Sequence, residues 1–225
     1  MIEVSMNKNP ADWEKENDGT EIRILFQNCR SMKNKFAHIA SDKCLQMGEI
    51  IILTETWLDR EQTADEYNIP GYNLNLNSVG RGRGIATYYK QNYNHATNVN
   101  YDGFSITKIE SEKLDIIGIY RSQEGSVTTL IMQLENLIID GKTTIIGGDV
   151  NICTLANPKN YVTQSLKEIG FNQIVRKATH TEGGLLDHIY IIQGHKRKFS
   201  YSVENFSKYY SDHDGIGLIL SEVEE

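Results

Sequence analysis

The sequence predicts an α/β sandwich in which two mixed β-sheets are covered by helices. After residue 20, apolar runs of strand length alternate with amphipathic segments of helical period. Residues 72–119 contain several strand candidates separated only by glycine and polar turns. These strands cannot form a purely parallel sheet, because parallel neighbours need a long crossover between them. With 225 residues and no internal repeat or linker-like composition shift, we expect a flexible leader at residues 1–20 and one catalytic domain at residues 21–225.

The elements follow from periodicity and from turn residues. Strands are expected at residues 22–26, 50–53, 72–76, 84–90, 104–109, 114–119, 143–146, 185–192 and 216–220. A helix is expected at residues 33–47, a second at 127–138 that ends before Gly141, and a third at 161–169 that ends before Gly170. The Arg81-Gly82-Arg83 segment is expected to form a hairpin turn.

Composition narrows the class of protein. Three separate cysteines, Cys29, Cys44 and Cys153, are typical of reduced thiols in the cytosol or nucleus and argue against a disulfide scaffold or a zinc site. No apolar run is long enough for a membrane span, and the first residues lack the apolar core of a signal peptide. The formal charge of −7 argues mildly against nucleic-acid binding, but basic islands at residues 32–35, 81–83 and 195–198 interrupt the acidic chain.

Polar residues with catalytic capability recur at the ends of the expected strands. Each one alone is typical of a turn. Side chains at neighbouring strand ends, however, converge on one cleft in layered α/β folds. The residues in question are Asn28, Glu55, Tyr120, Asp149, Asn151, Asp187, Asp212 and His213.

Their chemistry favours phosphodiester hydrolysis. Glu55, Asn28 and Asp212 offer only hard oxygen or amide donors, which favours Mg²⁺, with Mn²⁺ as a substitute, over zinc. His213 is expected to belong to an acid–base pair oriented by a second aspartate. Asp149 is a candidate to orient or deprotonate water, and Asn151 and Tyr120 are candidate donors to a phosphate oxygen. The remaining histidines, including His180, are interpreted as surface or core residues.

In chain order, these residues resemble the motifs of the endonuclease/exonuclease/phosphatase family. The matching segments are QNCR, TETWL, YR, GGDVN, LLDHI and SDH, which together extend over about residues 22–220. The segments NCRSM, RGRGIATYY and YRSQEG look most like the apurinic-endonuclease-like domain of non-LTR (LINE-type) retrotransposons. The resemblance implies a four-layered sandwich and a Mg²⁺-dependent endonuclease that nicks double-stranded DNA and leaves a 3′-hydroxyl for target-primed reverse transcription.

The resemblance also implies roles for individual residues. Glu55 would hold the metal with Asn28, and Asp212 would lie near the metal. Asp149 and Asn151 would position water and phosphate, Tyr120 would contact the phosphate, and Asp187 would orient His213. Whether Asp149 or His213 accepts the proton stays open. We expect DNA contacts from Arg30, Arg121, Thr181, Lys196 and Arg197.

Alternatives remain within and outside this chemistry. Arg30 stands where repair-type apurinic endonucleases often have an aspartate, which weakens a repair function. A deadenylase or a small-molecule phosphatase would share the same fold, and an inactive DNA- or protein-binding derivative is the non-enzyme alternative. The favoured hypothesis implies a nuclear protein, in transit through the cytoplasm, monomeric and not membrane-bound. Because the chain ends shortly after its last strand, it is expected to be part of a longer polyprotein with reverse transcriptase.

Overall fold

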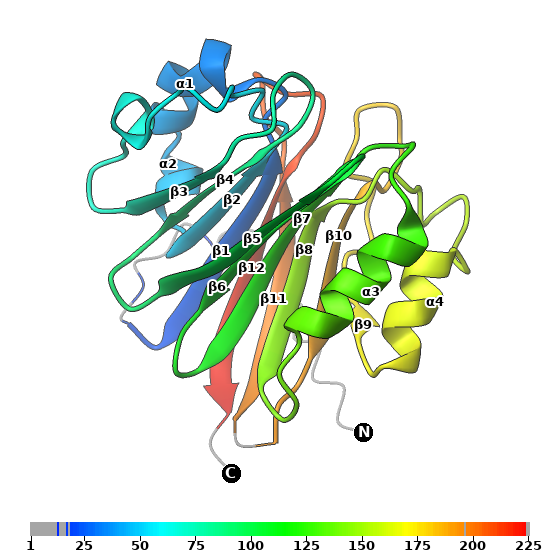
Figure 1. Ribbon diagram of the computed structural model, residues 1–225. Coiled ribbons are helices and arrows are strands. Elements are labelled where there is room, and N and C mark those ends of the chain that lie inside the picture. Colours follow the sequence, from blue (N-terminus) through cyan, green and yellow to red (C-terminus); the bar gives the residue numbers. More distant parts are fainter. Residues whose placement is uncertain (1–12, 14–16, 18, 196, 224–225) are drawn as a thin grey trace.

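The computed structural model shows two β-sheets packed face to face, with helices on both outer surfaces (Figure 1). It describes residues 13, 17, 19–195 and 197–223. Within this part of the chain, sheet A has the strand order β11-β12-β1-β2-β4-β3 and sheet B the order β5-β6-β7-β8-β10-β9. Both sheets are mixed, since β1–β2 and β7–β8 pair in parallel and the other neighbours pair antiparallel. The predicted four-layered α/β sandwich is confirmed.

The element bounds are close to those expected from the sequence. The strands are β1 Glu21–Asn28, β2 Ile50–Thr54, β3 Asn73–Asn77, β4 Ile85–Tyr89, β5 Asn94–Tyr101, β6 Phe104–Glu110, β7 Leu114–Arg121, β8 Thr143–Asp149, β9 Asn172–Gln173, β10 Asp187–Ile192, β11 Lys198–Phe206 and β12 Gly215–Val223. The helices are α1 Met32–Ser41, α2 Lys43–Gln46, the 3₁₀ helix η2 Ala64–Tyr67, α3 Val127–Leu137 and α4 Tyr161–Glu168. None of the described helices is long and apolar enough to cross a membrane.

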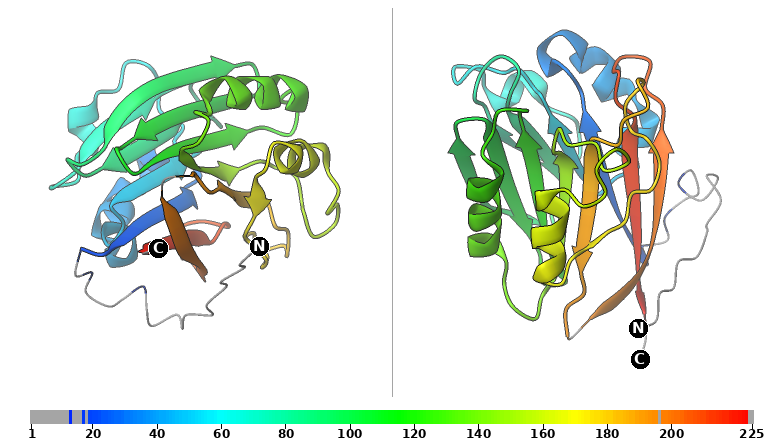
Figure 2. Two further views of the ribbon diagram at one scale, coloured as in Figure 1. Left: turned by 90° about the horizontal axis from the view of Figure 1, so that it is seen from below. Right: turned by 90° about the vertical axis from the view of Figure 1, so that its right-hand side faces the viewer.

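Apolar side chains fill the spaces between the layers. A central cluster joins the two sheets and includes Phe26 and Ile216 of sheet A with Ile145 of sheet B. Because side chains alternate along a strand, neighbours such as Leu25 face outward and pack against α1 and α2. On the other side, Leu130 of α3 packs with residues of sheet B and α4 in a third cluster. Figure 2 shows α3 and α4 on the outer face of sheet B.

The first helix is shorter than predicted because Asp42 interrupts it. The Asp42 carboxylate accepts hydrogen bonds from the backbone N–H groups of Cys44 and Leu45 and so caps the separate helix α2. The side chains of Lys208 and Tyr210 also contact Asp42, at 2.7 and 2.8 Å. These partners lie far away in the sequence, so the local apolar period gave no sign of the break.

Two long strands, β5 and β11, were not predicted. Both lie at sheet edges, and their sequences NHATNVNY and KFSYSVENF are mostly polar. On β5, Asn98 exchanges two side-chain hydrogen bonds with Asn75 of β3, at 3.0 and 3.2 Å. This carboxamide pair links the edges of the two sheets, and it explains why a polar strand is stable there.

The expected leader lies almost entirely outside the described residues, with Trp13 as an informative exception. Its indole is fully buried, packs against Phe206 with ring centroids 5.3 Å apart and donates a hydrogen bond to the carbonyl of Cys44. The buried Arg23 donates to the carbonyl of Trp13. At this position, therefore, the chain belongs to the core around sheet A.

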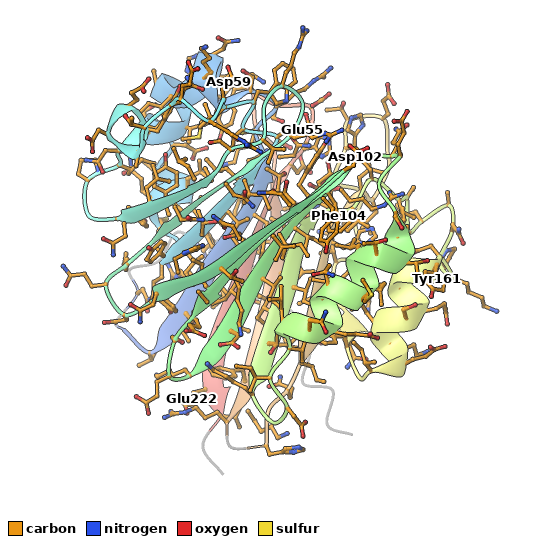
Figure 3. The ribbon with its side chains drawn as sticks, viewed as in Figure 1. Glu55, Asp59, Asp102, Phe104, Tyr161 and Glu222 are labelled. Atoms are coloured by element: carbon orange, nitrogen blue, oxygen red, sulfur yellow. The ribbon has the colours of Figure 1, made fainter. Side chains whose placement is uncertain are left out.

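Strand direction brings chemically active residues to one end of the sandwich. The parallel pairs β1–β2 and β7–β8 contribute their carboxyl ends, at Asn28, Thr54, Arg121 and Asp149. The antiparallel strands β10 and β12 contribute their beginnings, where Asp187 opens β10 and His213 precedes β12. Figure 3 shows Glu55 at this end of the molecule and Glu222 at the opposite end.

Candidate active site

Asn28 connects the two sheets at the centre of the candidate site. Its side-chain Nδ2 donates to Glu55 Oε1 at 3.0 Å and to Asp149 Oδ2 at 2.8 Å. Glu55 follows β2 of sheet A, whereas Asp149 ends β8 of sheet B. One carboxamide therefore fixes the relative positions of two carboxylates from different sheets.

The Asp149-Val150-Asn151 turn is held by its own polar groups. The backbone N–H of Asn151 donates to Asp149 Oδ1 at 2.8 Å, and its side-chain Nδ2 donates to the carbonyl of Arg121 at 2.7 Å. Asn151 adopts a left-handed backbone conformation with φ 54°. The turn therefore fixes the direction of the Asp149 carboxylate.

The two glycines before Asp149 allow close packing on both sides of β8. A Cβ at Gly147 would lie 2.4 Å from the Phe26 ring, and one at Gly148 would lie 2.0 Å from the carbonyl oxygen of Ile119. Gly148 also has φ 136°, which side-chain-bearing residues rarely adopt. The end of β8 can thus approach β1 and β7 only because both side chains are missing.

His213 is oriented by Asp187. Its Nδ1 lies 2.7 Å from Asp187 Oδ2, which also accepts a hydrogen bond from the Thr179 hydroxyl at 2.7 Å. Asp187 is paired in register with Asp149 across β10 and β8. The side chains of Asp149, Asp187 and His213 are all buried, and each places a ligand atom within 4.8 Å of the others.

Burial and mutual charge shift the ionisation of these groups. Burial and the nearby Asp187 raise the pKa of Asp149 well above its usual value, although His213 opposes this effect. Burial lowers the pKa of His213, but the hydrogen bond and charge of Asp187, with Asp149 and Asp212, outweigh it and raise the pKa to about 9. His213 is therefore a cation at neutral pH in this arrangement.

Tyr120 is a neutral donor beside the same carboxylates. The β7–β8 register places it opposite Asp149, and its side chain is buried. Burial, Glu55 and Asp149 raise the pKa of Tyr120 well above its ordinary value. The phenol consequently keeps its proton over the physiological range.

Asp212 is engaged by cationic and aromatic neighbours. Its Oδ2 forms an ion pair with Arg30 and lies 3.6 Å from the Nε2 of His180. The His180 ring also meets the His213 ring edge-on, with centroids 4.7 Å apart. The other oxygen, Oδ1, is buried without a hydrogen-bond partner, which leaves one acceptor position of Asp212 unused.

The donor set fits a hard divalent cation. Asp149, Asp187 and Asp212 supply carboxylate oxygens, the ligands that Mg²⁺ and Mn²⁺ prefer, and no cysteine lies in either of the metal-capable groups found among the described residues. Glu55 belongs to neither group. Those groups are Asp149–Asp187–His213 and His180–Asp212–His213. Asp149, Asp187 and His213 thus form a buried acidic and histidine cluster that can hold a metal ion once His213 has lost its proton.

The three residues expected to bind the metal have different surroundings in the structure. Glu55 presents a half-buried carboxylate. The Oδ1 of Asn28 accepts the backbone N–H of Arg30 at 3.0 Å, and its Nδ2 donates to carboxylates, so here Asn28 orients ligands. Asp212 is paired with Arg30.

The residues expected to contact DNA fall into different places. Arg30 and Thr181 are exposed beside the site, and the Thr181 N–H donates to the carbonyl of Asp212. Lys196 lies outside the described residues. Arg197 lies at the other end of the sandwich, where it pairs with Glu222 at 2.7 Å (Figure 3). The sequence could not place Arg197, because β11, which starts beside it, was not predicted.

Arg121 lies next to the site but points into the protein. Its guanidinium donates to the carbonyls of Gly125, Val150 and Gln123, at 2.8, 3.0 and 2.9 Å. The side chain is buried. Arg121 therefore braces the loops after β7 and β8, because unpaired carbonyls at the strand ends need a donor. Its expected contact with DNA stays a prediction.

Two residues at the site were missed in the sequence. His180 was interpreted as a surface or core histidine, yet it contacts both Asp212 and His213. Trp57 follows Glu55 by two positions, and its indole Nε1 donates to Glu55 Oε2 at 3.2 Å. Only their places in the sequence could have pointed to these two residues. Trp57 lies inside the TETWL segment, and His180 directly precedes Thr181, which was expected to contact DNA.

The described part of the chain contains five non-glycine residues with positive φ, all at this end of the molecule. They are Arg30, Ser31, Glu55, Trp57 and Asn151, with φ values from 45° to 84°. Such conformations cost roughly 1–3 kcal/mol each and persist where the surroundings impose them, often at functional sites. Their concentration after β1, β2 and β8 marks this end as the candidate site.

The arrangement of the two sheets is that of the endonuclease/exonuclease/phosphatase fold. No protein-family model and no curated protein matches the sequence. Among solved structures, the endonuclease domain of TRAS1, a telomere-specific non-LTR retrotransposon, matches with a TM-score of 0.62 and 13% identity, over 89% of this chain and 98% of that one. The structure supports the resemblance found in the sequence at the level of the fold.

Two further structures show the same architecture. The 3′ phosphatase NExo from Neisseria, bound to a product DNA hairpin, matches with a TM-score of 0.67 and 13% identity, over 88% of this chain and 98% of that one. An endonuclease/exonuclease/phosphatase family protein from Bacteroides thetaiotaomicron matches with a TM-score of 0.61 and 13% identity, over 89% of this chain and 95% of that one. At these identities the likeness concerns the fold alone.

Proposed function

We propose that the protein is a Mg²⁺-dependent DNA endonuclease that nicks double-stranded DNA and leaves a 3′-hydroxyl. The observation that carries this proposal is the buried constellation of Asp149, Asp187 and His213, joined through Asn28 to Glu55. The solved structures of similar fold include a retrotransposon endonuclease domain and a 3′ phosphatase bound to DNA, which supports a phosphate ester as the substrate.

The side chains suggest how hydrolysis would proceed. Asp149 accepts a proton from water, because its raised pKa makes it a stronger base than a solvent-exposed carboxylate. The water oxygen forms a bond to phosphorus while the bond from phosphorus to the 3′-oxygen breaks, and the 3′-oxygen takes a proton from solvent water and leaves as a hydroxyl. The products are a 5′-phosphate and a 3′-hydroxyl.

The remaining residues stabilise the negative charge of the transition state. His213, held as a cation by Asp187, and the neutral phenol of Tyr120 donate to non-bridging phosphate oxygens. Asn28 holds Asp149 and Glu55 in place, and Asn151 fixes the Asp149 turn. A divalent cation held by Glu55 would neutralise phosphate charge and stabilise the leaving oxygen.

The proposal extends to the biological role. The product with a 3′-hydroxyl would prime reverse transcription for a non-LTR retrotransposon, in the nucleus and within a longer polyprotein that carries the reverse transcriptase. Two observations favour this role over abasic-site repair. The fold is similar to that of the TRAS1 endonuclease domain, and Arg30 stands where repair-type apurinic endonucleases often have an aspartate.

Nicking of supercoiled plasmid tests the activity. We expect Mg²⁺ to convert supercoiled DNA to nicked circles, EDTA to prevent conversion, and His213→Ala to reduce the rate by at least about 100-fold. Tyr209→Phe serves as the matched control, because Tyr209 is 80% exposed and its hydroxyl bonds to His38, outside the proposed machinery. If Mg²⁺ at high protein concentration yields no nicked circles, the endonuclease proposal is wrong.

The products separate the competing functions. A DNA polymerase should extend the nicked circles directly if each nick carries a 3′-hydroxyl. Strong preference for an oligonucleotide with one abasic site would favour repair. Release of phosphate from a 3′-phosphorylated oligonucleotide without nicking would favour a 3′ phosphatase, the activity named for the structurally similar NExo.

A further inference from the structure

The chain makes an unusual turn directly after β2. Glu55 and Trp57 both adopt left-handed conformations, with φ 53° and 58°, and only Thr56 separates them. The backbone N–H of Trp57 donates to the carbonyl of Arg83 at 3.0 Å, and the N–H of Thr56 donates to that of Gly84 at 3.4 Å. The hairpin loop between β3 and β4 therefore holds this turn in place.

The turn folds the indole of Trp57 back onto the carboxylate of Glu55. The indole Nε1–H donates to Glu55 Oε2 at 3.2 Å, while Asn28 Nδ2 donates to Oε1 at 3.0 Å. Each carboxylate oxygen thus has one neutral N–H donor. Two donors from opposite sides restrict rotation of the Glu55 side chain without neutralising its charge.

The surroundings of Trp57 keep the ring in this position. A Cβ at Gly84 would lie 2.6 Å from the Thr56 hydroxyl, so the loop docks closely against the turn. The guanidinium of Arg81 lies over the Trp57 ring, 6.0 Å from its centroid. The ring is half-buried, so it lies between the loop and solvent beside the site.

We propose that Trp57 is a positioning residue for Glu55, whose indole N–H holds the carboxylate in the orientation that receives a divalent cation. This inference rests on the proposed function, because it takes Glu55 as a cation ligand. Groups that orient a metal ligand change metal affinity by about 10–100-fold when they are removed. If Trp57 only fills space, its N–H is dispensable.

Trp57→Phe tests the inference because it keeps an aromatic ring and removes the N–H donor. Mn²⁺ binding is measured without DNA, from the electron paramagnetic resonance signal of free Mn²⁺. We expect Trp57→Phe to bind about 10-fold more weakly than the wild type. Tyr209→Phe, which removes a hydrogen-bonding group outside the site, should bind as the wild type does.

A double-mutant cycle with Glu55→Gln shows whether the two residues act together. If Trp57 acts through Glu55, Trp57→Phe should have little further effect on Mn²⁺ affinity once Glu55 is neutral. Additive losses would overturn the inference. In nicking assays, Trp57→Phe should raise the Mg²⁺ concentration for half-maximal rate about 10-fold and leave the rate at saturating Mg²⁺ within about threefold.

A spectroscopic measurement covers the case in which Trp57→Phe fails to fold. The Raman band that reports indole N–H hydrogen bonding should shift in Glu55→Gln, because a neutral acceptor bonds more weakly than a carboxylate. An unchanged band overturns the inference. Equal Mn²⁺ affinity of folded Trp57→Phe and wild type also overturns it and leaves the proposed function intact, whereas a wild type that binds no Mn²⁺ contradicts both.

Discussion

The Nδ1 of His213 lies 2.7 Å from the Oδ2 of Asp187, and both side chains are buried. The sequence suggested such a pair, and the structure brings together two residues that lie 26 positions apart. The same aspartate oxygen also accepts the Thr179 hydroxyl, so Asp187 cannot turn away from the ring without losing two hydrogen bonds. Replacing Asp187 should therefore change the pKa of His213.

The first prediction concerns the pKa of His213 in the metal-free protein. NMR titration of the imidazole should give a value of about 9. Asp187→Asn should lower it by at least about one unit, because the main group that stabilises the cation is lost. A wild-type value near the ordinary figure of about 6.5 would contradict this account.

The same shift determines how folding stability depends on pH. Because the folded-state pKa is raised, the contribution of His213 is complete below its unfolded value, about 6.5, and is lost as pH rises through about 9. Chemical denaturation of wild type and Asp187→Asn should therefore show the largest difference in unfolding free energy at about pH 6 and a smaller one at about pH 10.

A second prediction concerns Gly147 and Gly148. Gly147→Ala should lower the free energy of unfolding by about 1–3 kcal/mol, because the new methyl group meets the Phe26 ring between the sheets. Gly148→Ala should cost more, since the methyl group meets the backbone of β7 and φ 136° is strained for alanine. Gly184→Ala is the control, because its Cβ would make only ordinary contacts of 3.5 Å or more. Equal effects of all three variants in denaturant titrations would refute this explanation.

A third prediction separates bracing from DNA binding at Arg121. Arg121→Ala should lower the free energy of unfolding by on the order of 3 kcal/mol, because three backbone carbonyls lose a charged donor. Under conditions in which Arg121→Ala is folded, the salt dependence of its DNA affinity should match that of the wild type. A reduced salt dependence would show instead that Arg121 reaches a phosphate.

For Arg30 we predict little effect on stability and a reduced salt dependence of DNA binding. Its side chain is 55% exposed, and among the described residues it pairs with Asp212 alone, at the site's rim. Arg30→Ala should change stability little, because exposed ion pairs contribute about 0–1 kcal/mol. In fluorescence-anisotropy titrations with duplex DNA over a series of salt concentrations, the slope of log affinity against log salt should fall by about 0.9, as expected for one lost phosphate contact. An unchanged slope would show that Arg30 only anchors Asp212.

The sequence by itself determined the fold class and the chemical types at the strand ends. Periodicity is a local property, so the buried strands around Ile50 and Ile145 could be read directly. Asn28, Glu55 and Asp149 were likewise visible as polar residues that follow apolar runs, and Asp187 as an acidic residue at the start of one. The polar edge strands β5 and β11 were missed, because their stability depends on partners such as Asn75 rather than on a local apolar pattern.

Only the tertiary structure decided which of these residues work together. The packing of the two sheets lets Asn28 reach both Glu55 and Asp149, and that packing is close because Gly147 has no side chain to meet Phe26. The same packing turns Arg121 inward onto backbone carbonyls and leaves Arg197 at the far end. The contact between Trp57 and Glu55 depends on two left-handed residues held by a distant hairpin. Such relationships arise from long-range packing and strand register, and a linear pattern of residue types cannot specify them.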